Sequence, residues 1–322
     1  MEISKKRIRS MIMSANIVGR FAPSPSGRMH LGNAFSYLLT WLSARSAGGR
    51  IVLRQEDLDP VRCNRNYADQ LEQDLLWLGL DWDEGGSGGG DPYYQSQRSD
   101  LYAHYLHELE GTGLIYPCFC TRGALHAPSA PHASDGTPIY PGTCRGLSPA
   151  QRAEKAMLRR PALRIAVPEQ EITFTDGLQG PYREHLARDC GDFILRRSDG
   201  VFAYQLAVVV DDALMGVNQV VRGRDLLSST PRQLWLQELL AFPHPEYYHA
   251  PLLCAGDGRR LSKRDGDLDL GELRAGGASP EILLGKLAHW AGLIDREEPV
   301  SLPELLREFD WSRVKRTDIT VK

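Results

Sequence analysis

Three of the chain's six cysteines lie in one stretch with the spacing of a metal site. "CFCTRGALHAPSAPHASDGTPIYPGTC" runs from Cys118 to Cys144, and it includes Cys120, His126 and His132. Thiolates and imidazoles are the preferred ligands of structural zinc, so either histidine would complete a tetrahedral set with the three cysteines. Three free or buried thiols would show the same spacing, so the spacing alone leaves both interpretations open.

A second stretch, "RFAPSPSGRMHLGNA" (20–34), holds residue types suited to binding anions. Arg20 can bind a carboxylate through two hydrogen bonds. His30 lies near an expected helix N-terminus, where phosphate is favoured, and Gly32 leaves its backbone open to a flat ring. A structural strand-to-helix turn has a similar composition, so the turn alone leaves both interpretations open.

A third stretch, "GRRLSKRDGD" (258–267), carries four cations within the six residues from Arg259 to Arg264. Lys263 could act as a mobile positive charge on a polyphosphate. A solvated surface loop is the alternative. The stretch lacks the spacing of a Walker loop.

These residues adjoin segments that alternate between strand and helix. The patterns predict strands over 16–23 and 50–57, and helices over 33–49 and 66–80, the first with Asn33 as its N-cap. This order predicts a parallel α/β sheet, in which ligands bind beyond the carboxyl ends of the strands. Residues 20–32 and 54–59 fall at those ends.

The remaining segments are read in the same way. We expect a surface connector at 84–92, a helix over 98–114, a Pro-, Gly- and Arg-rich insertion over 116–190, a hairpin turn at 198–200, a helix over 230–242 capped by Thr230, and helices over 280–293 and 302–309.

The composition is that of an ordinary globular protein. The 322 residues are 42% hydrophobic and 25% charged, with a formal net charge of −3. A strongly basic nucleic-acid coat is therefore excluded, although local basic patches are not. The other three cysteines are scattered, and no stretch has the length of a signal peptide or a membrane span. We expect a cytoplasmic, monomeric protein that does not associate with a membrane.

Five motifs carry a resemblance to a known family. "HLGN" (30–33) resembles the HIGH signature of class I aminoacyl-tRNA synthetases, and "RLSKR" (260–264) resembles their KMSKS loop, with Lys263 at the matching lysine. "RFAPSPSG" (20–27), "RQEDLDP" (54–60) and "VVRGRDLLSSTPRQ" (220–233) resemble the glutamyl subgroup. The resemblance extends from about residue 17 to about residue 295.

Within that subgroup, the chain resembles the glutamyl-queuosine tRNA(Asp) synthetases. Ordinary glutamyl-tRNA synthetases continue into a long anticodon-binding region, whereas this chain ends at Lys322, soon after "WAGL" (290–293). The resemblance implies that L-glutamate is activated with ATP, and that the glutamyl group passes to queuosine in the anticodon loop of tRNA(Asp). There are two alternatives. One is a compact glutamyl-tRNA synthetase that charges a tRNA 3′ end, and the other is a non-catalytic paralogue that acts as a binding module.

The family fold is an α/β class I Rossmann-type parallel sheet with a zinc-containing insertion and a short helical C-terminal part. The expected division is a flexible N-terminal tail over 1–16, catalytic halves over 17–115 and 191–256, the zinc insertion over 116–190, and the KMSKS-like loop with C-terminal helices over 257–322.

The resemblance also implies roles for single residues. Glutamate would lie against the segment from Arg20 to Ser24, and Glu56 would accept hydrogen bonds from the substrate ammonium. Tyr204 and Arg222 match the remaining glutamate contacts. Two cations and one anion suit a zwitterion with a second carboxylate. A structural ion pair between Glu56 and Arg222 is the alternative. The glutamate residues are thus Arg20, Phe21, Ala22, Pro23, Ser24, Glu56, Tyr204 and Arg222.

His30 and Lys263 match the family's ATP-site residues, together with Gly32 and Asn33. The substrate carboxylate attacks the α-phosphate in line, so positioning and charge neutralisation matter more than a protein nucleophile, and Mg2+ travels with ATP. Asn33 replaces the second histidine of the HIGH signature, and Arg260 replaces a lysine of the loop. For tRNA contact, candidates are Arg259, Arg260, Arg264 and "RVKR" (313–316).

The family's metal pattern is Cys-x-Cys followed by Tyr-x-x-x-Cys, which "YPGTC" (140–144) matches. The resemblance therefore implies a structural Zn2+ held by Cys118, Cys120, Tyr140 and Cys144, with His132 in reserve.

The matching lysine yields the first prediction. Lys263→Ala should lower the rate of glutamate-dependent pyrophosphate exchange by about 100-fold, since a charge contact to the transition state is lost. Exchange close to the wild-type rate would remove Lys263 from the site.

Overall fold

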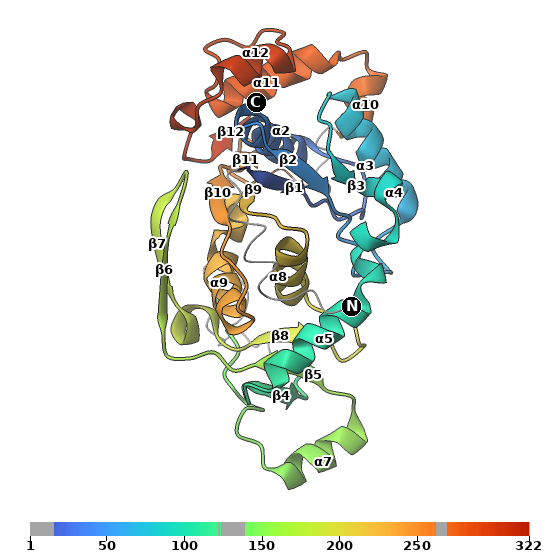
Figure 1. The fold of residues 1–322 in the computed structure, drawn as a ribbon, viewed down its shortest axis with the longest axis vertical. Helices are drawn as coiled ribbons and strands as arrows, with labels where there is room; N and C mark the ends of the chain where they lie inside the picture. The colour runs from blue at the N-terminus through green and yellow to red at the C-terminus, as the bar shows by residue number, and fades with distance from the viewer. Residues whose placement is uncertain (1–15, 122, 124–138, 260, 262–268, 322) are drawn as a thin grey trace.

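Short parallel strands form the centre of the protein (Figure 1). A computed structural model describes residues 16–121, 123, 139–259, 261 and 269–321. One sheet has the order β1 (Val18–Phe21), β2 (Arg50–Leu53) and β3 (Glu84–Gly85), and β9 (Gln219–Gly223) pairs with β10 (Glu246–Ala250). All of these pairs are parallel, as predicted.

The two groups of strands lie side by side although some 200 residues separate them. The Asn218 backbone N–H donates to the Val18 carbonyl, at 3.1 Å, and Val18 N–H donates to the Asn218 side chain, at 2.7 Å. The carboxyl ends of β1, β2, β9 and β10 therefore lie in one neighbourhood. This is the arrangement that a ligand cavity needs in an open α/β sheet.

The helices that connect or precede these strands are α2 (Leu31–Ser46), α3 (Arg65–Trp77), α8 (Tyr204–Leu214), η4 (Arg224–Ser229) and α9 (Thr230–Leu239). The prediction of Asn33 as N-cap is wrong, because the N-cap of α2 is His30 and Asn33 lies in the first turn. Ser229 rather than Thr230 caps α9. The Thr230 hydroxyl instead accepts a hydrogen bond from Arg222, at 2.8 Å.

Residues 84–92 are not the plain surface connector that their glycines suggest. They form β3, α4 (Gly86–Gly89) and η1 (Asp91–Tyr93), followed by η2 (Gln95–Gln97). The Glu72 carboxylate accepts hydrogen bonds from the Ser87 N–H, at 2.8 Å, and hydroxyl, at 2.6 Å. Gly85 has φ +92°, and a Cβ there would collide with the Leu53 carbonyl, so the glycine permits the pairing with β2.

The insertion carries its own antiparallel sheet at the far end of the molecule (Figure 1). Its elements, with the helix that leads into it, are α5 (Ser99–Glu110), β4 (Ile115–Cys118), α7 (Pro149–Leu158), β5 (Ala162–Ile165), β6 (Glu171–Asp176), β7 (Gly180–His185), η3 (Leu186–Cys190) and β8 (Phe193–Arg196). The sheet order is β4, β5, β8, so it includes a strand beyond residue 190. The hairpin turn at 198–200 is confirmed, because Phe202 forms an antiparallel bridge with Arg196, and α8 begins directly afterwards at Tyr204.

The C-terminal part packs back on the first catalytic half. Its elements are β11 (Leu253–Cys254), α10 (Leu270–Ala275), α11 (Pro280–Ala291), α12 (Leu302–Glu308), η5 (Trp311–Arg313) and β12 (Ile319–Thr320). Leu284, Leu287 and Leu305 share a buried core with residues of α2. Within 313–316, Val314 is buried and Lys315 N–H bonds the Ala291 carbonyl, so this segment is anchored.

None of the helices in the described part of the chain combines the length and apolar character needed to cross a membrane. The tail expected over 1–16 lies, up to residue 15, outside the described residues.

Candidate active site

A cavity of about 420 Å3 opens at the carboxyl ends of β1, β2, β9 and β10. This is the location that the strand order predicts. The predicted site residues that line it are Arg20, Ala22, Ser24, His30, Gly32, Asn33, Glu56, Tyr204 and Arg222.

Three predicted residues are not among those that line the cavity. Phe21 is fully buried and makes an edge-to-face contact with Tyr37, with ring centroids 5.2 Å apart. Pro23 is buried as well. These two residues belong to the supporting structure, because neither presents a side chain to the cavity. Lys263 lies outside the described residues.

Arg222 is held in place by hydrogen bonds to three side chains and to the Leu226 carbonyl. Its guanidinium donates to His249 Nε2 (3.0 Å), to the Thr230 hydroxyl (2.8 Å) and to the Tyr204 hydroxyl (3.4 Å). His249 Nδ1 donates a hydrogen bond to the Asp176 carboxylate, at 2.6 Å, which fixes the neutral tautomer with Nε2 as an acceptor. Arg222 is therefore oriented by a buried Asp–His pair while its remaining surface faces the cavity.

Arg54 organises the opposite side of the cavity. Its side chain is fully buried and donates to Asp212, at 2.7 Å, and to Glu56, at 3.0 Å. Asp212 lies 3.7 Å from the Arg20 Nε, so one carboxylate contacts both arginines. Burial raises the pKa of Glu56 even though Arg54 opposes that shift. The position of Glu56 therefore depends on Arg54.

The cluster is balanced in charge. Asp211 accepts hydrogen bonds from Arg98, Gln95 and Tyr102, at 2.7 to 2.8 Å, and lies 3.7 Å from Arg54. Three cations (Arg20, Arg54, Arg98) thus meet three anions (Glu56, Asp211, Asp212). Such balance is what allows charged groups to remain in a buried position.

The sequence interpretation missed Arg54, Tyr37, His249 and the two aspartates. A signal for the aspartates exists, since adjacent acids at the end of the apolar run 206–210 must find buried partners. No comparable signal exists for Tyr37, which lines the cavity from α2, or for His249 on β10.

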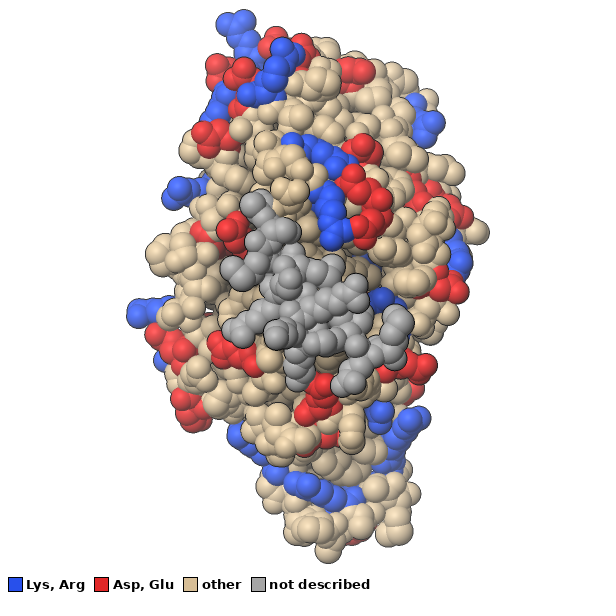
Figure 2. Space-filling view, in the orientation of Figure 1, with Lys and Arg blue, Asp and Glu red and all other residues tan. Residues whose placement is uncertain are grey.

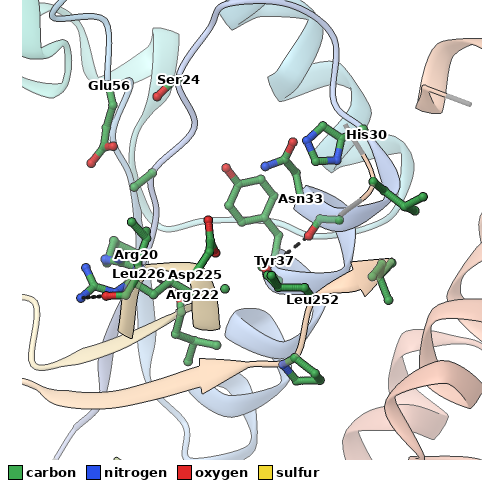
Figure 3. A pocket seen from close by; sticks show the side chains of 18 of the residues that line it. Arg20, Ser24, His30, Asn33, Tyr37, Glu56, Arg222, Asp225, Leu226 and Leu252 are labelled. Atoms are coloured by element: carbon green, nitrogen blue, oxygen red, sulfur yellow. Dashed lines mark hydrogen bonds between the residues drawn. The ribbon is translucent and has the colours of Figure 1, made fainter. Parts of the chain in front are cut away.

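The other end of the cavity is formed by the first turn of α2 (Figure 3). His30 and Asn33 lie there together, away from Arg20, Arg222 and Glu56. A Cβ on Gly32 would approach the His30 ring to 3.2 Å, so a side chain at this position would crowd the imidazole. No acidic residue occurs in this turn, which leaves the helix N-terminus suited to an anion.

Comparison with known proteins decides the family. Residues 16–319 match the family described as tRNA synthetases class I (E and Q), catalytic domain. The chain belongs to the class I tRNA synthetases. It is a ligase of the aminoacyl-tRNA synthetase type.

Similar synthetases include two curated proteins and one solved structure. The "Glutamyl-Q tRNA(Asp) synthetase" of Symbiobacterium thermophilum is 52% identical over 95% of this chain and 96% of its own. The protein of that name from Nitratidesulfovibrio vulgaris is 52% identical over 86% and 87%. A glutamate tRNA ligase from Elizabethkingia meningosepticum, solved in complex with its amino acid, has a TM-score of 0.81 and 28% identity over 95% of this chain and 67% of its own.

The predicted metal residues of this synthetase also come together. The sulfur atoms of Cys118, Cys120 and Cys144 lie within 4.8 Å of one another, with 3.7 Å between Cys120 and Cys144. The Tyr140 hydroxyl lies 3.5 Å from Cys118 Sγ and 3.6 Å from Cys120 Sγ. Tetrahedral zinc with ligands at about 2.3 Å separates its sulfurs by about 3.8 Å, so the four side chains fit a zinc ion.

Hydrogen-bond donors approach two of the three sulfur atoms. Arg164 Nε donates to Cys118 Sγ, at 3.3 Å, and the Phe119 N–H donates to Cys144 Sγ, at 3.4 Å. Arg164 also lies over the Tyr140 ring, 3.9 Å from its centroid. These contacts orient the ligands from outside the cluster. His126 and His132 lie outside the described residues.

The Asp176–His249–Arg222 chain predicts a pH dependence of stability. Burial, reinforced by Arg222, lowers the pKa of His249 to about 4 from 6.5. Between pH 6.5 and pH 4 the imidazole is therefore protonated in the unfolded chain but neutral in the folded chain. The free energy of unfolding falls as the pH falls through this range. From pH 7 to pH 5 this group should remove about 2 kcal/mol of unfolding free energy.

Urea unfolding at pH 7 and pH 5 tests this dependence. His249→Gln should lose most of the pH-dependent difference, whereas His104→Gln, at an exposed histidine, should retain it. An imidazole pKa near 6.5 for His249 by NMR would contradict the prediction.

The cysteine cluster predicts the zinc content of variants. Cys120→Ser and Tyr140→Phe should each reduce bound zinc, measured by elemental analysis of purified protein, because each removes one ligand atom. His132→Ala should retain it. Full zinc in Tyr140→Phe together with loss in His132→Ala would make the histidine the fourth ligand.

Proposed function

We propose that this synthetase activates L-glutamate with ATP and transfers the glutamyl group to queuosine in the anticodon loop of tRNA(Asp). The observation that supports this most directly is one cavity lined by Arg20, Arg222 and Glu56. Two guanidinium groups and one carboxylate complement the two carboxylates and the ammonium of glutamate. The names of the relatives from Symbiobacterium and Nitratidesulfovibrio support the choice of acceptor.

In this proposal glutamate lies against Arg20, Ala22 and Ser24. Arg222 binds a carboxylate of the substrate, because hydrogen bonds from its guanidinium to neighbouring residues fix its orientation. One of these neighbours is Tyr204 at the start of α8. Glu56 receives the substrate ammonium. A smaller amino acid would lack the second carboxylate and would lose the charge-assisted hydrogen bonds that this carboxylate makes to one guanidinium.

ATP binds at the other end, along His30, Gly32 and Asn33. The N-terminus of α2 favours phosphate there, and the open backbone at Gly32 accommodates the nucleoside. Lys263 neutralises the developing charge from its loop, and Mg2+ accompanies the phosphates. The glutamate carboxylate then attacks the α-phosphorus and pyrophosphate leaves, so no covalent protein intermediate is required.

Zinc has a structural role in this scheme. Cys118, Cys120, Tyr140 and Cys144 would hold it between β4 and the segment leading to α7, with Tyr140 bridged to Gly191. When bound, the ion links parts of the insertion that share only a small apolar core.

Contact with tRNA would use local basic patches rather than overall charge. Lys and Arg side chains gather at the end of the molecule where the insertion lies (Figure 2). Exposed Lys155 and Arg160 belong to this end, at α7 and just beyond it. Of the predicted candidates, Arg259 is exposed and paired with Asp257, at 3.2 Å, while Arg260 and Arg264 lie outside the described residues.

The test is an acceptor assay with ATP and radiolabelled glutamate. The wild-type enzyme should label tRNA(Asp) only when the tRNA carries queuosine, and the label should survive removal of the tRNA 3′ end. Label on the 3′ end of tRNA(Glu) would support a compact glutamyl-tRNA synthetase instead. Absence of glutamate-dependent pyrophosphate exchange would support a binding module.

A further inference from the structure

Tyr37 lines the cavity but has no part in the contacts to glutamate and ATP proposed above. It lies on α2, four residues after Asn33 and seven after His30, which caps the helix. Residues at this spacing share one face of a helix, with about one turn between successive members. Tyr37 therefore extends the face that His30 and Asn33 present to the cavity, one turn farther from the helix N-terminus.

The hydroxyl of Tyr37 lies between the two ends of the cavity. Figure 3 shows it between His30 and Asn33 on one side and Glu56 on the other. The ring is held from the side of β1, because it packs edge to face on Phe21, with ring centroids 5.2 Å apart. Tyr37 is thus placed where bound glutamate would meet bound ATP.

This hydroxyl is a hydrogen-bond donor that the described part of the protein leaves unused. Tyr37 is only 8% exposed, and its hydroxyl has no hydrogen-bond partner among the described residues. Ser36 on the same helix also lines the cavity, but its hydroxyl donates to the Gly32 carbonyl, at 3.2 Å. A donor that is largely withdrawn from water gains free energy when a bound ligand supplies an acceptor.

The hydroxyl of Tyr37 keeps its proton near neutral pH. Burial raises the pKa of Tyr37 well above its usual value, the Glu56 carboxylate adds to the rise, and the Arg20 guanidinium opposes it. A neutral donor suits this position, because the ions around Arg54 are already balanced and a further buried charge would disturb them.

The substrate atoms expected at this position are those that react. In the proposed function Glu56 receives the ammonium of glutamate, while ATP lies along the first turn of α2. The carboxylate on the same carbon as the ammonium is therefore the one that extends from Glu56 toward ATP. One of its oxygens attacks the α-phosphorus, and the other is left to accept a hydrogen bond.

We propose that Tyr37 is a further catalytic residue of the activation step, and that its hydroxyl donates a hydrogen bond to the carboxylate oxygen that does not attack. The contact fixes the rotation of the carboxylate, so that the attacking oxygen faces the α-phosphorus in line. This inference rests on the activation step of the proposed function and is independent of the acceptor.

The step is balanced without proton transfer. A bond forms between the attacking oxygen and the α-phosphorus, the bond from that phosphorus to the pyrophosphate oxygen breaks, and pyrophosphate leaves with the electron pair. The oxygen that accepts from Tyr37 becomes the carbonyl oxygen of the adenylate. The same hydrogen bond is therefore present before and after the reaction.

Tyr37→Phe removes the hydroxyl and keeps the ring against Phe21. The kcat for glutamate-dependent pyrophosphate exchange should fall by about tenfold, whereas the KM for ATP should stay at the wild-type value. Tyr105→Phe is the matched control, because Tyr105 is also 8% exposed, packs edge to face on Phe242 and does not line the cavity. The control should exchange at the wild-type rate, and both variants should keep the wild-type midpoint of urea unfolding.

Two analogues of the adenylate isolate the contact. A glutamyl sulfamoyl adenosine retains the carbonyl oxygen, whereas a glutamol adenylate has a methylene group in place of the carbonyl. By titration calorimetry, Tyr37→Phe should bind the first about tenfold more weakly than the wild type and the second within about twofold of it. A purely structural effect of the substitution would weaken both.

A wild-type kcat in Tyr37→Phe, or an equal change in affinity for the two analogues, would overturn this assignment. A raised KM for ATP with a wild-type kcat would also overturn it, because Tyr37 would then contact the nucleotide alone. If the wild type neither exchanged pyrophosphate nor bound either analogue, the proposed function would fail and this inference with it. Transfer to an acceptor other than queuosine would refute only the proposed acceptor, since exchange and analogue binding involve no tRNA.

Discussion

The contact between Arg54 and Asp212 is the interaction on which the rest of the site depends. It joins the end of β2 to α8, across the whole inserted segment, with a 2.7 Å hydrogen bond between buried side chains. Asp212 also lies near Arg20, and Arg54 bonds Glu56. Removal of either partner would disturb the charge balance of the whole buried cluster, because each of the two also contacts a second ion of the cluster. One pair therefore sets the positions of two groups that face the cavity.

This coupling explains why the two catalytic halves form one site. Arg20 and Glu56 come from the first half, and Arg222 and Tyr204 come from the second. Asn218, directly before β9, bonds β1 through its backbone N–H and its side chain, and the charged groups add a second link through their side chains. Because each half carries charges that only the other neutralises, the separated halves would each leave buried ions unpaired.

Much of this arrangement could be predicted from the sequence. Apolar runs followed by charged residues predicted the parallel strands and placed Arg20 and Glu56 at their carboxyl ends. The spacing predicted a cluster of three cysteines, and the family resemblance added Tyr140, which lies 3.5 Å from Cys118 Sγ. Local chemistry misled in other places. Gly85 permits a strand rather than marking a loop. The Thr230 hydroxyl accepts a hydrogen bond from Arg222 and does not cap a helix. Arg54 and His249 could not be predicted, since their roles come from partners 158 and 73 residues away.

The central claim is that Asp212, through Arg54 and Arg20, positions the groups that bind glutamate. Its most direct test is the affinity of Asp212→Asn for L-glutamate, measured by titration calorimetry on protein shown to be folded by circular dichroism. We predict that the dissociation constant for glutamate rises at least about tenfold, a loss of about 1.4 kcal/mol, while that for ATP stays near the wild-type value. Wild-type affinity for glutamate in the folded variant would contradict the account.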